Sequence, residues 1–366
     1  MLDNRRKQIS LFILTFVAMI VAKLLVLILP TKYFYDNTRI VSMVNKDGLI
    51  PSWVGSYETT ANVFSFLNIL NFHSMVEWSF ALGVVLTSLI SLFIFQNCVL
   101  DITQEVFWLC CIVLLNIYVF NIGKDSIQFC FFYISYLVTM THLSKNIKMI
   151  IIFIIFYIES IYFRSYFVLV SVFFIAISLL TFRTQLSYRK IKVSSYYFYI
   201  LLIVYAFLII SSIAFPDQYD DVANVRAGVN EEREGAADAA TLISNVIPGN
   251  TLIIALINYP INAIRMIFPI ELLLKGITYI PFVLFQIIAT IFFIRYSKDI
   301  LNRTIVDSTN ILLYSIYLAF LLTSFFFEPD FGSWVRHEMA SFPVFQYLFF
   351  SKYCKHTLIK KGIGIQ

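Results

Sequence analysis

Long apolar runs separated by short polar segments make up most of this sequence. A helix that spans a membrane needs about 20 mostly apolar residues. The pattern predicts ten such helices, at 9–29, 76–95, 106–122, 126–143, 149–163, 166–181, 195–215, 276–295, 308–327 and 339–351. The stretch 250–272 is also apolar, but Pro260 and Pro269 interrupt it, which predicts re-entrant or interfacial helices. We therefore expect an all-α, polytopic integral membrane protein that forms a single membrane domain over residues 1–366.

The composition agrees with that class. Hydrophobic residues make up 60% of the 366 positions and charged residues 13%, against roughly 45–50% and about 25% in soluble domains. A soluble fold has too little interior for so many apolar side chains, so the excess must face lipid. The charged start before 9–29 resembles a signal peptide. The apolar run is too long, however, and no small-residue cleavage site follows it, so we expect a retained helix.

The placement of Lys and Arg predicts which side of the membrane each loop faces, because cytoplasmic loops are enriched in them. With the N-terminus inside, the inner segments contain 16 of the 27 basic residues, namely Arg5, Arg6, Lys7, Lys145, Lys148, Arg183, Arg189, Lys190, Lys192, Arg295, Lys298, Arg303, Lys352, Lys355, Lys360 and Lys361. Both termini are then cytoplasmic, and the long loops 30–75 and 216–249 lie outside. The acidic loop 216–249 is expected to be either a solvated loop or a substrate lid.

Charged residues near the outer ends of the predicted helices are candidates for function, because ionisable groups at membrane depth are costly. Asp36 follows the first helix, where a carboxylate can act as a base or cap the next helix. Lys124 and Asp125 lie in a turn, where they can form an anion site at a helix start or pair with each other. Arg164 lies at the tip of a predicted hairpin, where it can bind phosphate or pair with Glu159.

The predicted outer turn 327–338 contains the densest set of chemical groups. It includes three carboxylates, an Arg and one of the four His, at Glu328, Asp330, Arg336, His337 and Glu338. Pro329 and Gly332 predict a specific turn. The aromatic residues Phe331 and Trp334 would not be needed in a merely solvated loop. We therefore expect this turn to be part of an active site.

These positions suit a substrate with anionic and hydroxyl-rich parts at the lipid interface. The predicted catalytic residues are Asp36, Glu328, Asp330, His337 and Glu338. The predicted diphosphate ligands are Lys124, Arg164, Arg265 and Arg336, with a lipid-headgroup anchor as the alternative for Arg265. The predicted sugar ligands are Asp125, Tyr166 and Trp334. In such a site, cations stabilise a departing diphosphate, and a carboxylate or His removes a proton from the acceptor hydroxyl.

Other chemistries lack their sequence signals. The five Cys and four His show no zinc-ligand spacing, and the sequence contains no P-loop or dinucleotide fingerprint. We therefore expect no metal, no cofactor and no nucleic-acid partner. Lys23, inside the first predicted helix, is expected to extend toward an interface.

The order of these motifs resembles bacterial repeat-unit polymerases of the Wzy type. The motifs that carry the resemblance are Tyr35-Asp36, Gly123-Lys124-Asp125, Phe163-Arg164-Ser165-Tyr166 and Glu328-Pro329-Asp330-Phe331-Gly332-Ser333-Trp334-Val335-Arg336-His337-Glu338. The resemblance implies metal-independent polymerisation of undecaprenyl-diphosphate-linked oligosaccharide repeat units into O-antigen or capsular polysaccharide. It also implies a site at the outer face of the bacterial cytoplasmic membrane, and a flippase and a chain-length regulator as partners.

Two alternatives remain open at this point. An acidic residue after the first helix also resembles the wider C-type membrane glycosyltransferases, in which Asp36 would match the catalytic carboxylate. Such an enzyme would add a single sugar from a polyprenyl-phosphate donor. The third reading is a flippase for lipid-linked oligosaccharide, which would require charged residues along a path through the membrane.

Overall fold

The computed structural model describes residues 2–46, 55–95, 100–187, 191–214, 241–249 and 251–350. Within these residues the chain is helical, and the one pair of bridged extended residues is Leu242 and Asp330. Seven helical segments are long and apolar enough to cross a membrane: Asn4–Ile28, Met75–Phe95, Ile102–Val119, Phe167–Leu186, Val193–Ala214, Ile280–Leu301 and Ser308–Phe327. The all-α, multi-pass membrane class predicted from the sequence is thus confirmed.

The remaining three predicted spans form helices that do not meet the length or charge requirements of a span. Helix α6, Lys124–Met140, has 17 residues. Helix α7, Lys145–Tyr162, contains Lys145, Lys148 and Glu159. The third segment includes the end of α14 (Phe331–Ala340). A turn at Ser341 follows this helix, and the chain is helical again over 342–350. The count of ten spans therefore stays a prediction.

The structure divides into two compact units. Unit 1 comprises the described residues of Met1–Tyr136, Ile161–Ser165 and Arg336–Gln366, and unit 2 those of Leu137–Ser160 and Tyr166–Val335. The chain passes between the units several times. The single membrane domain stays a prediction.

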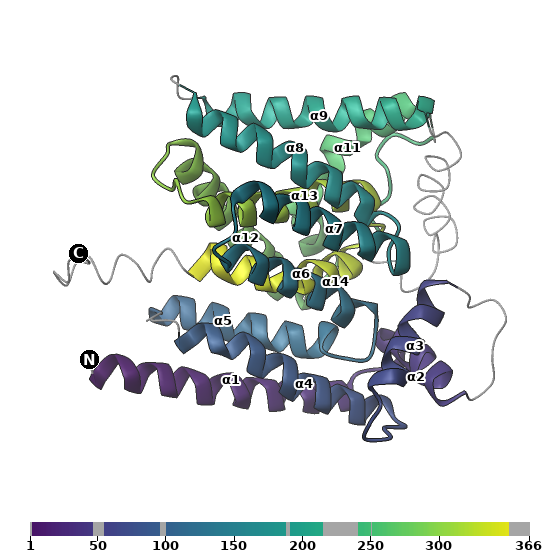
Figure 1. Ribbon diagram of the computed structural model, residues 1–366. Coiled ribbons are helices and arrows are strands. Elements are labelled where there is room, and N and C mark those ends of the chain that lie inside the picture. Colours follow the sequence, from purple (N-terminus) through teal and green to yellow (C-terminus); the bar gives the residue numbers. More distant parts are fainter. Residues whose placement is uncertain are drawn as a thin grey trace. The chain divides into compact units, whose positions relative to one another are not determined.

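Unit 1 contains a group of three long helices, which are coloured purple to blue in Figure 1. Helix α1, Leu2–Ile28, packs against both α4, Met75–Ser91, and α5, Ile102–Leu114. A 3-10 turn, η2 (Leu92–Phe95), extends α4, and a π-helical turn, η3 (Leu115–Val119), extends α5. The buried Trp108 of α5 donates from Nε1 to Thr15 Oγ1 of α1 over 3.1 Å. Apolar packing and interhelical hydrogen bonds of this kind hold helices together in a membrane.

The predicted loop 30–75 contains two helices in the structure. After a 3-10 turn, η1 (Thr31–Phe34), come α2, Tyr35–Asn45, and α3, Ser56–Leu67. Each is short and amphipathic, so neither resembles a membrane span. Apolar residues from both helices pack on Trp78 of α4 in one buried cluster, which consists of Ile40, Val41, Val44, Ala61, Phe64, Trp78 and Ile122. This packing holds α2, and therefore Asp36, beside the start of α6.

Unit 2 is organised around α13, Ser308–Phe327, which is buried on almost all sides. It packs against α8, Phe167–Leu186, and α11, Leu252–Ile267. Further elements are α9 (Val193–Ala214), α12 (Ile280–Leu301) and the 3-10 turns η5 (Ile270–Leu274) and η6 (Ile277–Tyr279). A helix that is apolar all round suits such a central position.

Helix α11 has 16 residues and contains Pro260, so the interfacial or re-entrant helices expected near 250–272 stay a prediction. The break of the apolar stretch around Arg164 is present, because α7 ends at Tyr162 and α8 begins at Phe167. In the predicted loop 216–249, residues 216–240 lie outside the described residues. The proposed lid or solvated loop therefore stays a prediction.

Candidate functional site

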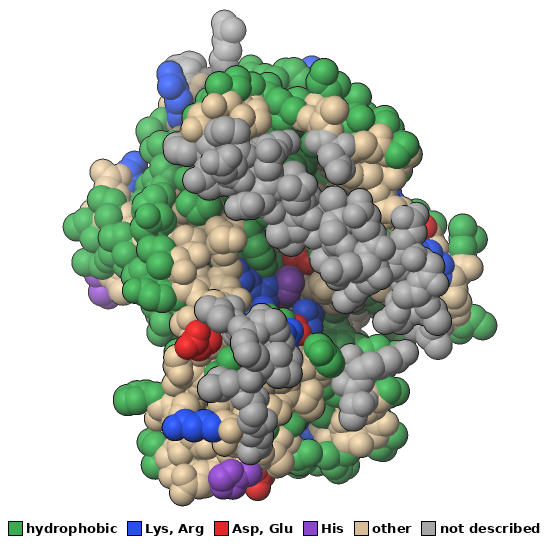
Figure 2. Space-filling model, turned by 90° about the vertical axis from the view of Figure 1, so that its right-hand side faces the viewer, with side chains coloured by type: hydrophobic (Ala, Val, Ile, Leu, Met, Phe, Trp, Pro, Cys, Tyr) green, Lys and Arg blue, Asp and Glu red, His purple; other side chains and the backbone are tan. Residues whose placement is uncertain are grey.

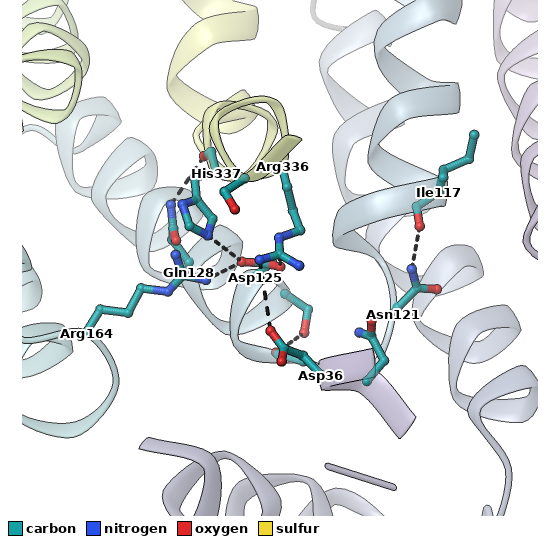
Figure 3. Close-up of polar contacts among 12 residues, drawn as sticks. Asp36, Ile117, Asn121, Asp125, Gln128, Arg164, Arg336 and His337 are labelled. Carbon is teal, nitrogen blue, oxygen red and sulfur yellow. Dashed lines mark hydrogen bonds and ion pairs between the residues drawn. The ribbon is translucent and has the colours of Figure 1, made fainter. Parts of the chain in front are cut away.

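Asp125 lies at the centre of a group of charged side chains in unit 1 (Figure 3). Its carboxylate is ion-paired with Arg164. Its Oδ2 lies 3.1 Å from Nε of Arg336, and its Oδ1 lies 3.5 Å from Nε2 of His337. We call Asp36, Lys124, Asp125, Arg164, Arg336 and His337 the Asp125 cluster.

Four separate chain segments supply the cluster. Lys124 and Asp125 form the first turn of α6, and Arg164 lies in the turn that follows α7. Arg336 and His337 belong to α14, and Asp36 lies in the first turn of α2. Side chains from these segments converge in Figure 3. A further contact between segments comes from Gln128 of α6, whose Nε2 donates to the backbone carbonyl of His337 over 3.3 Å.

Asp36 forms the more exposed edge of the cluster. One carboxylate oxygen accepts a hydrogen bond from the Tyr57 hydroxyl at 2.9 Å, and the other lies 4.0 Å from Arg336. The side chain of Asp36 is 33% exposed, against 11% for Asp125. Asp36 is therefore the carboxylate that a substrate can reach more easily.

The ring of Tyr57 in α3 contacts two cations, Lys124 of the cluster and Arg39 of α2. Nζ of Lys124 lies 3.7 Å from the centre of the Tyr57 ring, and the guanidinium carbon of Arg39 lies 4.6 Å from it. Cations over an aromatic face are attracted to it, more strongly where water is excluded. Burial, and then the charge of Asp36, raise the pKa of Tyr57 to about 12. The hydroxyl thus stays protonated and can donate to Asp36.

The cluster carries a surplus of positive charge. The cations Arg39, Lys124, Arg164 and Arg336 surround two carboxylates, Asp36 and Asp125. Burial, together with the neighbouring Arg164 and Arg336, lowers the pKa of Lys124 to about 8. Such a surplus in a partly buried place favours an anionic ligand. Figure 2 shows basic, acidic and His side chains gathered near the middle of one face.

His337 differs from the cations in its charge state. Burial, and then the charges of Arg164, Arg336 and Lys124, hold the pKa of His337 well below its usual 6.5. The imidazole is therefore neutral at neutral pH. A neutral imidazole can accept a proton, and the lowered pKa makes His337 a weaker base than an ordinary His.

Five of the twelve predicted site residues lie in unit 2, outside the cluster. Arg265 is paired with Glu271 through two contacts, Nε to Oε2 at 2.9 Å and Nη2 to Oε1 at 2.8 Å. Asp330 accepts from Ser333 N at 2.8 Å and Ser333 Oγ at 3.0 Å. These are the contacts of a residue that caps the start of α14.

The aromatic pair predicted to bind sugar also lies in unit 2 and serves in packing. Trp334 is fully buried and donates from Nε1 to Gln286 Oε1 at 3.2 Å. Tyr166 stacks on Phe327 with ring centres 5.0 Å apart. In this structure the ring of Trp334 has no exposed face for a sugar.

The two remaining predicted carboxylates are both buried. Glu328 is 2% exposed in unit 2, and Glu338 is 2% exposed in unit 1, one residue beyond His337. Their proposed catalytic roles, like those of the other predicted site residues, stay predictions.

Several residues of the site were missed by the sequence analysis. Arg39 lies three positions after Asp36, so helical spacing within α2 could have linked the two. Tyr57 and Gln128 gave no signal, since a Tyr or a Gln in an apolar sequence is usually part of the packing. Asn37 donates from Nδ2 to the carbonyl of Ile122 at 2.6 Å, a contact between α2 and the segment before α6.

The expectation for Lys23 was wrong. It does not extend toward an interface, because it is only 1% exposed and donates to the carbonyls of Asn116 and Phe120, each at 2.7 Å. The backbone carbonyls beside it satisfy the amino group inside the protein, so no route to water is needed.

Among the described residues, no three His, Cys, Asp or Glu side chains lie close enough together to hold a metal ion. Comparisons with protein-family models, curated proteins and solved structures found no significant match to this chain. The Asp125 cluster and its charges are therefore the features that point to a function.

Proposed function

We propose that this chain is a membrane glycosyltransferase that polymerises undecaprenyl-diphosphate-linked oligosaccharide repeat units into O-antigen or capsular polysaccharide. The observation that carries the proposal is the Asp125 cluster. It combines buried cations, a neutral His337 and a half-exposed Asp36 within one compact unit of an apolar helical protein. A lipid-linked diphosphate sugar offers the matching groups, namely two phosphates, hydroxyls and an apolar chain.

The reaction in this proposal is a displacement at the anomeric carbon of the growing glycan. A hydroxyl of the new repeat unit forms the bond to that carbon, and the bond from that carbon to the diphosphate oxygen breaks. The diphosphate leaves with the bonding electrons, and the positive charges of Lys124, Arg164 and Arg336 stabilise it electrostatically. The hydroxyl proton passes to a base, for which Asp36 and His337 are the candidates.

Each cluster residue then has a role that its contacts support. Arg164 and Arg336 can bind phosphate oxygens in a bidentate manner. Asp125, which we predicted to bind sugar, instead holds the two guanidinium groups and His337 in place. Arg and Lys supply the positive charge that a metal ion supplies in other diphosphate sites.

The proposal includes a setting in the cell. The basic inner segments support ten spans with both termini in the cytoplasm of a bacterium, and the site at the outer face of the cytoplasmic membrane. The substrate would reach the site through a flippase, and a chain-length regulator would act on the product.

The test uses a strain that lacks this chain and is complemented with variants. Arg336→Ala and Arg164→Ala are expected to abolish long glycan chains on a gel while the proteins still insert into the membrane. Arg295→Ala is the matched control, because Arg295 is exposed on α12, and it should leave chain length unchanged. Wild-type chain length in the Arg336→Ala strain would refute the site assignment.

Two further observations separate the alternatives. A missing decoration with normal chain length would identify a single-sugar C-type transferase. Accumulation of lipid-linked substrate on the inner leaflet would identify a flippase.

A further inference from the structure

Lys23 is a buried lysine in the C-terminal part of α1 with three oxygen acceptors. Its Nζ donates to the backbone carbonyls of Asn116 and Phe120 at 2.7 Å each, and to Oδ1 of Asn121 at 3.4 Å. An ammonium group has three donors, so three acceptors satisfy it. The two carbonyls belong to the π-helical end of α5, where helix carbonyls otherwise lack partners.

The space for this lysine is created by Gly83 of α4. A Cβ atom at position 83 would lie 2.4 Å from Cε of Lys23 and 3.0 Å from Oδ1 of Asn116. These distances are shorter than van der Waals contact, so only Gly fits at this position without displacing Lys23. The sequence of α4 therefore accommodates the lysine specifically.

From Lys23, hydrogen bonds reach Asn121, and the chain continues from there to the Asp125 cluster. Asn121 accepts from Ser79 Oγ at 2.6 Å and donates to the carbonyl of Ile117 at 2.6 Å, as Figure 3 shows for the second bond. The next residue, Ile122, accepts from Asn37 at 2.6 Å. Lys124 and Asp125 follow two and three positions later.

A second glycine allows α2 to approach this segment. A Cβ atom at Gly123 would lie 2.9 Å from Nδ2 of Asn37. Asn37 directly follows Asp36, so the bond to Ile122 fixes Asp36 relative to Lys124 and Asp125. Lys23 holds one side of the segment 116–123, and Asn37 holds the other.

We propose that Lys23 is a positioning residue for the Asp125 cluster. Through the carbonyls of Asn116 and Phe120 it holds the segment 116–123, and this segment sets where Lys124 and Asp125 lie relative to Asp36. The role of the cluster in glycosyl transfer rests on the proposed function, but the positioning itself does not.

The experiment compares Lys23→Met with Lys148→Met in the full-length protein. Lys148 is a matched control in unit 2, because it is also buried and donates to the carbonyl of Thr139 at 2.8 Å. Hydrogen–deuterium exchange is measured on peptides that cover 116–126, and polymer formation is measured with lipid-linked repeat units. Lys23→Met should accelerate exchange in 116–126 and reduce the rate of transfer by about 10²-fold, as displacement of a catalytic group by about 1 Å does. Lys148→Met should change neither.

A second variant keeps the proposal testable if Lys23→Met fails to fold. Gly83→Ala pushes on Lys23 without removing its charge. It should reproduce the faster exchange and the slower transfer, and Gly83→Ala combined with Lys23→Met should be no worse than Lys23→Met alone. Independent, multiplying effects of the two changes would contradict the proposal.

The outcomes separate this inference from the proposed function. If exchange in 116–126 is faster but transfer keeps the wild-type rate, Lys23 has a structural role only, and the positioning role is refuted. Unchanged exchange in Lys23→Met also refutes it. If the wild-type protein forms no polymer, the proposed function fails. In that case, faster exchange in 116–126 together with weaker binding of inorganic pyrophosphate would still support the positioning role.

Discussion

Nε of Arg336 lies 3.1 Å from Oδ2 of Asp125, although the chain passes through the whole of unit 2 between the two residues. The same carboxylate also holds Arg164 and contacts His337. One buried carboxylate thus neutralises part of the charge of two cations, Arg164 and Arg336. This arrangement brings positive charges close together at a lower electrostatic cost than cations alone would have.

Loss of the Asp125 charge is expected to reduce stability, whereas loss of the Asp36 charge is expected to reduce glycosyl transfer. Asp125→Asn removes the charge that holds two guanidinium groups, and breaking a buried pair in this way costs about 3–5 kcal/mol of unfolding free energy. Asp36→Asn affects a carboxylate that is 33% exposed, so we expect little change in stability but a loss of transfer. Thermal unfolding in detergent and the glycan ladder measure the two effects.

Two results would contradict these expectations for Asp36. If Asp36→Asn lowers the unfolding temperature as much as Asp125→Asn does, Asp36 is a structural residue. If Asp36→Asn retains full transfer, it is not the base, and His337→Gln becomes the next variant to test.

Lys124 predicts how anion binding depends on pH. Because its pKa is lowered from 10.5 to about 8, it loses its charge as the pH rises through about 8. We expect binding of inorganic pyrophosphate, measured by calorimetry, to weaken between pH 7 and pH 9. In Lys124→Arg the charge persists, since the pKa of Arg exceeds 12, and binding should fall much less.

The lowered pKa of Lys124 weakens anion binding as the pH rises, but it has the opposite effect on the stability of the fold. Between about 8 and 10.5 the unfolded chain binds more protons at this Lys than the folded protein does. The contribution of Lys124 to the free energy of unfolding therefore rises with pH in that window.

The binding prediction has its own contrary result. A pyrophosphate affinity that is equal at pH 7 and pH 9 in the wild type would exclude Lys124 from the anion site.

Tyr57 is expected to act through both its hydroxyl and its ring. Tyr57→Phe removes the hydrogen bond to Asp36 and keeps the ring beneath Lys124 and Arg39. A bond to a charged group is worth about 1.5–3 kcal/mol, and partial exposure reduces this, so we expect transfer to fall about tenfold. Tyr57→Leu removes the ring as well, and each lost cation–π contact costs about 0.5–2 kcal/mol. It should therefore also lower the unfolding temperature, which Tyr57→Phe should change little.

Local sequence pattern predicted much of the fold. The apolar runs around 9–29, 76–95 and 308–327 coincide with long helices, because the hydrophobicity needed to cross a membrane is a property of a contiguous segment. The helices α2 and α3 were missed, since their apolar residues are few and are buried against each other and against distant residues such as Trp78 and Ile122. Their stability comes from packing with distant residues.

The candidate site was predicted only in part. Asp36, Lys124, Asp125, Arg164, Arg336 and His337 were all candidates on residue type and position, but so were Arg265 and Asp330. Those two form contacts within unit 2, with Glu271 and with Ser333. Nothing in the spacing along the chain distinguished the two groups.

The sequence by itself determined that this protein is helical and belongs in a membrane, because the hydrophobic effect acts on each segment according to its own composition. It also determined which few charged residues are available for chemistry. The tertiary structure decided that Asp125 pairs with Arg164 and Arg336, and that Lys23 is held by the end of α5. Coulomb and hydrogen-bond energies depend on distances in space, and these are set by how the helices pack.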